Sequence, residues 1–413
     1  MTSSSSVGPA PASSSAGSGP LHIVLAEFLP SGGLFQFTYN LGDVLAKAGH
    51  QVTLLTGPDP ELGSSLPNYK IVSLFPTWHP NKDDTSSGLR RKIRRAGRAG
   101  LLAWSWVRLI RYTRRHQPEI VQVGELRFAL DSVFAVLLGR LKGRTAMVDV
   151  AHNPVPYDVH GNSDSVEKSG AVTTKALRAA YRAFDLVMTL GPGPRDQLLS
   201  VFPEVRRTAI IDHGSYSQYD KEAAAAPTPG AVPPRVLFFG SWTRYKNLPL
   251  LLEAFAKVHA QIPEAELIVA GPVMPDVDLA AIETMAASIP GVQLRPGYVA
   301  TEDVPMLFGG ARLVALPYEI INISGVVHLA YTFGRPVVAT DVGSMRDVVT
   351  DGVTGLLAPP SIDEFAAALL ALLAAPAEAD RMGREIQEYV ARELSWEGSA
   401  ARVVAGYRSA LGQ

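Results

Sequence analysis

The sequence contains no cysteine. This absence excludes disulfide bonds, a thiolate nucleophile and any cysteine-ligated metal site, and it is compatible with a reducing compartment. The sequence also has no run of about eighteen apolar residues, so it predicts no helix that spans a membrane. We therefore expect a cytoplasmic protein that is either free or attached peripherally to the inner face of the cell membrane.

The first nineteen residues lack both the basic start and the apolar segment of a secretory signal, and residues 1–19 are predicted to be a disordered tail. The whole chain has 413 residues, of which 47% are hydrophobic. This is enough for two or three domains with real cores. The net charge of −1 is unevenly spread, with +7 in residues 1–218 and −8 in the remainder. The distribution indicates a molecule of two parts.

Apolar runs alternate with helical patterns in the first part. The run LHIVLAEF (21–28) reads as a buried strand, PSGG follows as a turn, and FTYNLGDVLAKAGH has a helical pattern before the next strand, QVTLLT (51–56). Such strand–helix–strand units build parallel sheets with helices on both faces. Further strands are predicted in PEIVQVG, RTAMVDVAHN, FDLVMTLG and RTAIIDHG.

The alternation stops at DKEAAAAPTPGAVPP and restarts at RVLFFG (235–240). It continues with the predicted strand AELIVAGP (265–272) and the strand-like pieces ARLVALPY, RPVVAT and GLLAPP. The sequence thus predicts an α/β protein with two tandem, doubly wound, Rossmann-like domains that face a central cleft, where ligands bind beyond the carboxyl ends of the strands. The expected parts are a first domain over 20–218, a linker over 219–234, a second domain over 235–390, and a C-terminal helix over 391–413 that packs back on the first domain.

Several of these strands are followed by glycine-bearing turns, at Gly32–Gly33, Gly240, Gly271, Gly297 and Ser324–Gly325, and Lys246 follows Gly240 by six residues. Glycine lets a ligand approach the backbone, and helix N-termini present free N–H groups to anions. Each feature also has a plainer interpretation, as a tight turn or a solvated lysine. No complete GxGxxG and no Walker A motif occurs, which argues against a dinucleotide dehydrogenase and a P-loop ATPase.

The motifs SGGLFQFTYNLGDVLAKAGHQVTLLTGP, VAHNPVPY, DHGSYSQY, FFGSWTRYKNLPLLLEAFAKV, PGYVATEDVPMLFGGARLVALPY and SGVVHLAYTFGRPVVATDVGSMRDVVTDGVTGLL occur in this order. Together they resemble the GT-B glycosyltransferases of the retaining family that uses nucleotide-sugar donors, often called family four. The resemblance covers 20–411. It implies that a diphosphate is held at the second domain's strand ends, with Lys246 as its cation. The donor diphosphate residues that it implies are Gly32, Gly33, Ser241, Arg244, Lys246, Ser324, Gly325 and Val326.

The resemblance also assigns the other parts of the site. It implies His152, Lys246 and Glu319 as catalytic residues. Gly271, Tyr298, Val299 and Leu329 are implied around the base and ribose. Asn153, His213 and Gly214 are implied on the acceptor side.

Three positions depart from the family pattern. Ser241 stands where the family usually has an arginine, and Ile321 and Leu329 stand where it often has two glutamates. Glu319 is displaced by two residues from the first of those positions, and Arg244 is the candidate to replace the arginine. The segment resembles a branch of the family with SGV and LAYxFG, in which the start of the helix would hold the diphosphate.

The resemblance implies a retaining hexosyltransferase that uses a UDP- or GDP-linked sugar, without a metal or other cofactor, and a glycan, lipid-linked or natural-product acceptor. The leaving phosphate would take the acceptor's proton, so no protein nucleophile is named. The motif DVD (276–278) is better explained as a helix cap than as a metal site. Two alternatives stay open, namely a catalytically silent subunit that binds nucleotide or a partner, and the same fold with epimerase or cyclitol-coupling chemistry.

Residues 89–116 hold ten Lys or Arg and no acidic residue, interleaved with Trp and aliphatic side chains. A helix of this composition can lie on an anionic membrane surface. It can equally be a solvated basic face whose apolar residues belong to the core. No nucleic acid partner is expected, because no recognised nucleic-acid-binding module accompanies the charges.

Overall fold

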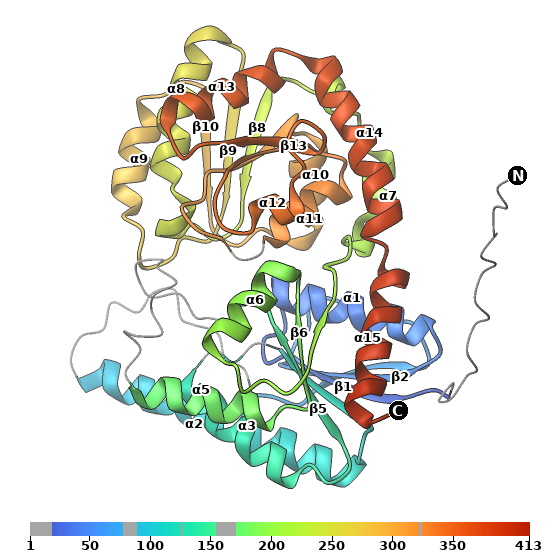
Figure 1. Ribbon diagram of the computed structural model, residues 1–413. Helices are drawn as coiled ribbons and strands as arrows, with labels where there is room; N and C mark the ends of the chain where they lie inside the picture. Colours follow the sequence, from blue (N-terminus) through green and yellow to red (C-terminus); the bar gives the residue numbers. More distant parts are fainter. Residues whose placement is uncertain (1–18, 77–88, 125, 127, 154–170, 322–323) are drawn as a thin grey trace, which may run out of the picture.

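The computed structural model describes residues 19–76, 89–124, 126, 128–153, 171–321 and 324–413. It contains two parallel β-sheets, each covered by helices on both faces, one above the other in Figure 1. The predicted α/β class with two Rossmann-like units is therefore confirmed. Buried apolar strand residues explain the arrangement, because parallel strands that are covered on both faces are apolar along their whole length.

The first sheet has seven strands in the order β3-β2-β1-β4-β5-β6-β7. The strands are β1 His22–Ala26, β2 Gln51–Thr56, β3 Tyr69–Ser73, β4 Ile120–Gly124, β5 Ala146–Ala151, β6 Leu186–Thr189 and β7 Thr208–Ile210. The second sheet has six strands in the order β10-β9-β8-β11-β12-β13. They are β8 Arg235–Phe239, β9 Glu266–Gly271, β10 Val292–Pro296, β11 Leu313–Leu316, β12 Val337–Thr340 and β13 Gly355–Ala358.

Helices alternate with these strands along the chain. In the first part they are α1 Gly33–Lys47, α2 Leu89–His116, α3 Ala129–Leu141, α5 Ala171–Ala183 and α6 Pro192–Val201. In the second part they are α7 Asp220–Ala225, α8 Leu248–Gln261, α9 Leu279–Ala287, α10 Val304–Gly309, α11 Gly325–Thr332, α12 Met345–Val348, α13 Ile362–Leu373 and α14 Pro376–Glu393. The last helix, α15 Trp396–Leu411, packs on the first sheet.

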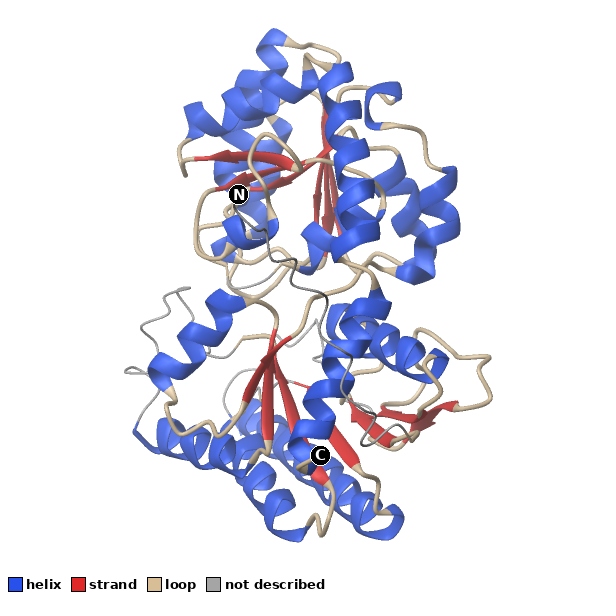
Figure 2. Ribbon diagram, turned by 45° about the vertical axis from the view of Figure 1, so that its right-hand side comes forward, coloured by secondary structure: helices blue, strands red, loops and turns tan. Residues whose placement is uncertain are grey.

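The order of each sheet reverses once, between β1 and β4 in the first and between β8 and β11 in the second. At the position where the strand order reverses, the loops after the two neighbouring strands run in opposite directions. This creates room for a ligand at the carboxyl edge of the sheet. The two edges face each other across the middle of the molecule (Figure 2). Gly32 follows β1 and Gly240 follows β8, so two of the predicted glycine turns stand at these points.

Two strands were not predicted from the sequence, β3 and β10. Both lie at the edge of a sheet and pair on one side only. Their residues are largely half-buried or exposed. A strand of this kind lacks the continuous apolar run that identified the central strands.

The segment expected to be a linker without regular structure begins with a short helix. Residues 220–225 form α7, and a single turn of 3-10 helix follows at Pro229–Ala231. This turn packs against α14, where the N–H of Gly230 donates to Asp380 over 2.6 Å. The alanine-rich composition favours this helix, although it has no apolar periodicity.

The last two helices belong to different parts of the molecule. In α14, Met382 and Ile386 are buried in the core of the second sheet. In α15, Val403 and Tyr407 are buried in the core of the first sheet, and the Tyr407 hydroxyl donates to Gln122 over 2.6 Å. Figure 1 shows the chain passing from one part to the other between α14 and α15. The C-terminal segment therefore joins the two parts a second time.

None of the helices in the described part of the chain is both long enough and apolar enough to cross a membrane. The predicted tail lies, except for its last residue, outside the described residues. The DVD motif lies before α9. There Asp278 caps the helix by accepting from the N–H of Ala281 over 3.2 Å, as the sequence predicted.

Candidate functional site

Three neighbouring strands of the second sheet end in glycines with left-handed backbones. Gly240 after β8 has φ of 106°, Gly271 at the end of β9 has 145°, and Gly297 after β10 has 130°. An added Cβ at Gly271 would lie 1.9 Å from the Gly240 carbonyl oxygen. Only glycine allows this contact. The strand ends therefore offer a bare backbone surface that a ligand can approach closely.

Lys246 lies over this surface. Its side chain is 7% exposed, and Nζ lies 5.5 Å from the centre of the Tyr318 ring. It is so close to the glycine turn that a Cβ on Gly240 would be 3.0 Å from Nζ. Burial lowers the pKa of Lys246 from 10.5 to about 8. Among the described residues no carboxylate forms a salt bridge with it. A buried ammonium of this kind is suited to an incoming anion.

The N-terminus of α11 provides further groups for an anion. The helix begins at Gly325, and Ser324 before it is buried and forms no side-chain cap with the described residues. An added Cβ at Gly325 would lie 2.8 Å from the Tyr216 hydroxyl, so a larger residue here would require this side chain to shift. The first N–H groups of a helix have no partner within it and carry partial positive charge.

These features border a cavity of about 410 Å³ between the two sheets. Residues from both parts line it, and ten of them were predicted as site residues. The predicted residues on its wall are Gly32, Gly33, Ser241, Lys246, Gly271, Tyr298, Val299, Gly325, Val326 and Leu329. The other nine residues of the wall were not predicted as site residues. They are Gln36, Glu61, Tyr216, Tyr219, Phe239, Gly240, Pro272, Thr301 and Val304.

Seven predicted site residues lie outside the wall of this cavity. Arg244 and Glu319 have exposed side chains beside it, and their backbone N–H groups bond to Asp276 over 3.0 Å and to the Tyr245 carbonyl over 2.7 Å. Ser324 adjoins the wall at the start of α11. The other four lie on the side of the first sheet, and they are His152, Asn153, His213 and Gly214.

His152 and His213 are buried around Phe37 of α1. Their ring centres lie 4.8 Å and 5.1 Å from the phenyl centre. His213 also stacks on His328 of α11, with ring centres 4.4 Å apart. Burial lowers the pKa of His213 to about 4, despite its hydrogen bond with the Gly214 carbonyl, and holds the pKa of His328 well below its usual value. These neutral rings join the two parts of the molecule next to the cavity.

The cavity wall contains a carboxylate that the sequence did not identify. Glu61, in the loop between β2 and β3, accepts from the Gly32 N–H and from the Gln36 amide, each over 2.9 Å. It also accepts from the Tyr298 hydroxyl over 2.9 Å and from the Thr301 hydroxyl. Two of these donors belong to the first part of the molecule and two to the second. Glu61 therefore holds the cavity closed on the side of Tyr298.

We expect Glu61→Ala to weaken the contact between the two parts. The substitution leaves four donors without their charged acceptor, and bonds to charged groups each contribute about 1.5–3 kcal/mol. Partial replacement by water reduces the total, so a loss of about 1–3 kcal/mol in the free energy of unfolding is expected, with a larger radius of gyration in X-ray solution scattering. Glu302→Ala, at an exposed neighbouring carboxylate, is the control, with an effect of at most about 0.5 kcal/mol. Equal effects of the two substitutions would contradict the role of Glu61.

Sequence patterns could have identified some of the wall residues that were not predicted. Tyr216 and Tyr219 follow the strand β7 closely in the motif DHGSYSQY, where side chains of a carboxyl edge are expected. Glu61 had no such signal. It stands in a polar loop, and its partners Tyr298 and Thr301 are more than two hundred residues away along the chain.

The two parallel sheets, their opposed carboxyl edges and the cavity between them define the GT-B class of glycosyltransferase folds. The structure is similar to sucrose-phosphate synthase from Thermosynechococcus elongatus, with a TM-score of 0.70 and 21% identity over 94% of this chain and 99% of that one. It is also similar to Anabaena HepE solved with UDP and glucose, with a TM-score of 0.66 and 15% identity over 94% of this chain and all of that one. At this identity the likeness shows the fold.

Sequence comparison gives the family. A model described as Glycosyl transferases group 1 matches residues 233–375, and one described as Glycosyltransferase Family 4 matches residues 31–214. The chain belongs to this family of GT-B glycosyltransferases, the family-four type that the sequence motifs indicated.

Relatives of known activity match over part of their length. A D-inositol 3-phosphate glycosyltransferase of Segniliparus rotundus is 32% identical over 209 residues, which are 49% of this chain and 46% of that protein. An alpha-D-kanosaminyltransferase of Streptomyces kanamyceticus is 25% identical over 67% of this chain and 73% of that protein. The chain thus spans about half the length of the first of these relatives.

Proposed function

We propose that the protein is a retaining glycosyltransferase that moves a hexosyl unit from a UDP- or GDP-linked sugar to an acceptor, without a metal ion. The observation that carries the proposal is the buried Lys246 ammonium over the glycine turns. It faces a cavity that the N-terminus of α11 also borders. Anabaena HepE was solved with UDP and glucose, and starch synthase IV with ADP, which supports a nucleoside diphosphate as the ligand of such a cavity.

The charges of the site fit the departure of a diphosphate. When the bond from the sugar to the diphosphate breaks, negative charge grows on the leaving oxygen and positive charge on the sugar ring. The Lys246 ammonium and the N–H groups at Gly325 and Val326 are fixed in advance and stabilise the growing negative charge. The leaving phosphate then takes the proton of the acceptor hydroxyl, which attacks the same face of the ring. No protein nucleophile is required.

The nucleoside belongs at the other end of the cavity. Tyr298 and Val299 line this end, and Glu61 reaches it from the first part of the molecule. Leu329, at the position of the family's ribose glutamate, is buried in the wall and cannot accept a hydrogen bond through its side chain. Glu61 is the carboxylate on the described wall, and we infer that it takes over hydroxyl recognition there. Its present donors Tyr298 and Thr301 would then be partly displaced by the ligand.

The acceptor is proposed to be a glycan, a lipid-linked sugar or a natural product. The named relatives transfer to or from small polar compounds, as the names D-inositol 3-phosphate glycosyltransferase and alpha-D-kanosaminyltransferase indicate. The acceptor would enter from the first sheet, where His152, Asn153, His213 and Gly214 were placed by the resemblance. Both histidines are packed against Phe37. Their role would therefore be to shape this side of the cleft.

Thermal unfolding with UDP, GDP, ADP or dTDP, each with and without Mg²⁺, tests the donor class. A ligand that binds the folded protein alone stabilises it by about 2.7 kcal/mol at a hundred times its dissociation constant. We expect one nucleotide to raise the unfolding temperature by several degrees without metal, and the Lys246→Ala variant to show no rise. Hydrolysis of the matching nucleotide sugar, with the anomeric configuration of the product followed by NMR, tests the reaction.

The second candidate is a catalytically silent subunit that binds nucleotide or a partner. Its support is the absence of the family's arginine and two glutamates, since Ser241, Ile321 and Leu329 carry no charge. A nucleotide that stabilises the protein while no sugar is released or transferred would favour this candidate. No stabilisation by any of the four nucleotides would contradict the transferase proposal and favour a silent subunit that binds a partner.

A further inference from the structure

One face of the first part is strongly basic and has few compensating acids. Helices α2, α3 and α5 pack in one layer on the same side of the first sheet, where Trp106, Leu138 and Leu177 share one core. Figure 1 shows this layer at the end of the molecule away from the second sheet. Neither α2 nor α5 contains an acidic residue. The acid of α3, Asp131, is buried and accepts from the Trp106 indole over 2.8 Å.

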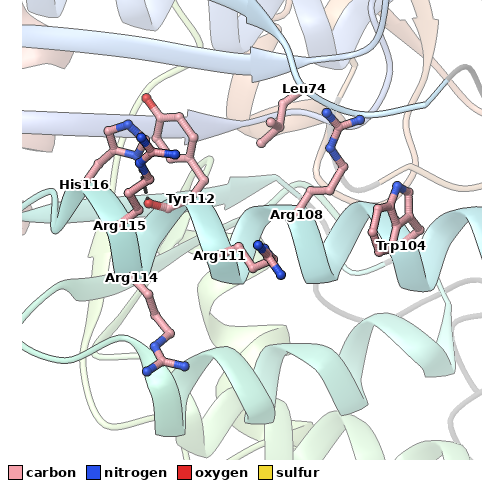
Figure 3. A pocket seen from close by; sticks show the side chains of 8 residues that line it. All are labelled: Leu74, Trp104, Arg108, Arg111, Tyr112, Arg114, Arg115 and His116. Carbon is pink, nitrogen blue, oxygen red and sulfur yellow. Dashed lines mark hydrogen bonds between the residues drawn. The ribbon is translucent and has the colours of Figure 1, made fainter.

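The outer side of α2 carries a row of arginines. A hollow of about 820 Å³ lies along this helix, and Figure 3 shows the side chains that line it. Its lining consists of Leu74, Trp104, Arg108, Arg111, Tyr112, Arg114, Arg115 and His116. Among the described residues, no carboxylate lies within salt-bridge distance of these four arginines. On α5, by contrast, Arg178 and Arg182 share Glu204. The unpaired positive charge of this layer is thus concentrated on α2.

Apolar side chains lie exposed in the same layer. Trp104 on α2 is 53% exposed, although Trp106 two residues later is fully buried. On α3, Val133, Leu137 and Leu141 are exposed at intervals of four residues, so they form one stripe along the outer side of the helix. Isolated exposed apolar residues need no explanation, but a stripe beside a basic helix indicates a partner surface.

We propose that this layer, through the outer sides of α2 and α3, binds the surface of a membrane that contains anionic lipids. Arginines meet the lipid phosphates, while Trp104 and the stripe on α3 enter the boundary between head groups and acyl chains. A helix of 28 residues extends for about 42 Å and provides a long contact in the plane of the surface. A free polyanion such as RNA would use the arginines, but it would gain nothing from Val133 and Leu137. The apolar stripe therefore favours a bilayer.

The proposal goes beyond the proposed function and does not depend on it, because vesicle binding needs neither donor nor acceptor. Lipid binding without glycosyl transfer, or transfer without lipid binding, would separate the two. If the protein shows both lipid binding and glycosyl transfer, the first part of the molecule would hold the cleft near acceptors carried by a lipid.

Sedimentation of the full chain with vesicles tests whether the arginines of α2 bind anionic lipids. We expect binding to vesicles that contain phosphatidylglycerol at physiological salt, none to pure phosphatidylcholine, and weaker binding at high salt. Near an anionic surface each arginine contributes roughly fivefold to the affinity. Arg108→Glu/Arg111→Glu should therefore lower the affinity by at least about 25-fold. The control Arg295→Glu/Arg384→Glu makes the same charge change at exposed positions of the second part and should have little effect.

Removing the apolar stripe tests the nature of the partner. Val133→Gln/Leu137→Gln should reduce vesicle binding several-fold while all arginines remain, and Met306→Gln, at a 63% exposed residue of α10, should not. Circular dichroism and thermal unfolding of each variant show whether it is folded. Failure to bind anionic vesicles would overturn the proposal. So would binding that is insensitive to the stripe variant and abolished by heparin, which would indicate a free polyanion instead.

Discussion

Lys246→Ala is expected to lower the rate of sugar transfer by two to three orders of magnitude. Removing one preorganised group that stabilises negative charge in a transition state typically costs a factor of 10²–10³. Lys246 has the position for such a role, because it is buried, contacts the Gly240 turn and forms no salt bridge with the described residues. Steady-state rates with the nucleotide sugar identified by thermal unfolding provide the measurement. Lys257→Ala, at an exposed lysine of α8, is the matched control.

The pH dependence gives an independent check on Lys246. Burial lowers its pKa to about 8, so the free protein loses the ammonium as the pH rises through this value. We expect kcat/KM, which reports the free enzyme, to fall about tenfold per pH unit above pH 8. Bound diphosphate stabilises the charged form, so kcat should fall only at higher pH. A Lys246→Ala enzyme within a few-fold of the unsubstituted enzyme, or a kcat/KM that stays level to pH 10, would contradict this role.

The same pKa shift has a defined effect on stability. Between the folded pKa of about 8 and the ordinary value of 10.5, the unfolded chain binds more protons at this lysine than the folded chain does. The contribution of Lys246 to the free energy of unfolding therefore increases with pH across this interval. Lys246→Met should remove this rise, and it should stabilise the protein below pH 8, because no charge is then buried.

Gly271→Ala is expected to have the largest effect on folding, with a loss of more than about 4 kcal/mol in the free energy of unfolding. Two costs combine at this position. Its φ of 145° is unfavourable for any residue with a Cβ, and the added Cβ would lie 1.9 Å from the Gly240 carbonyl oxygen. The clash is with backbone at the end of β8, which cannot move away without breaking its pairing with β9. Denaturant unfolding followed by tryptophan fluorescence measures the loss.

Gly297→Ala separates the two costs. Gly297 has a similar φ of 130°, but an added Cβ would meet nothing within 4 Å. Only backbone strain remains there, which costs about 1–3 kcal/mol. The difference between the two variants gives the energy of the contact between the strand ends. If Gly271→Ala were no worse than Gly297→Ala, the close approach of Gly240 and Gly271 would not exist in solution.

The sequence alone determined the class of fold and the order of its parts. Continuous apolar runs identified the central strands because these are covered on both faces. The basic segment of residues 89–116 was assigned to a helix, which the structure shows as α2. The edge strands β3 and β10 were missed because their exposure removes that signal. The glycine turns and Lys246 were recognisable because their spacing after a strand is local.

The tertiary structure decided how these pieces form one site. The wall of the cavity combines Gly32 and Glu61 of the first part with Lys246, Tyr298 and Gly325 of the second. These residues are far apart in the chain, and no local spacing relates the loops of one sheet to those of the other. The carboxylate of Glu61 is the clearest case, because its loop shows no pattern and its function depends on donors from both parts. Contacts between distant segments are determined by packing, and local sequence patterns do not predict these contacts.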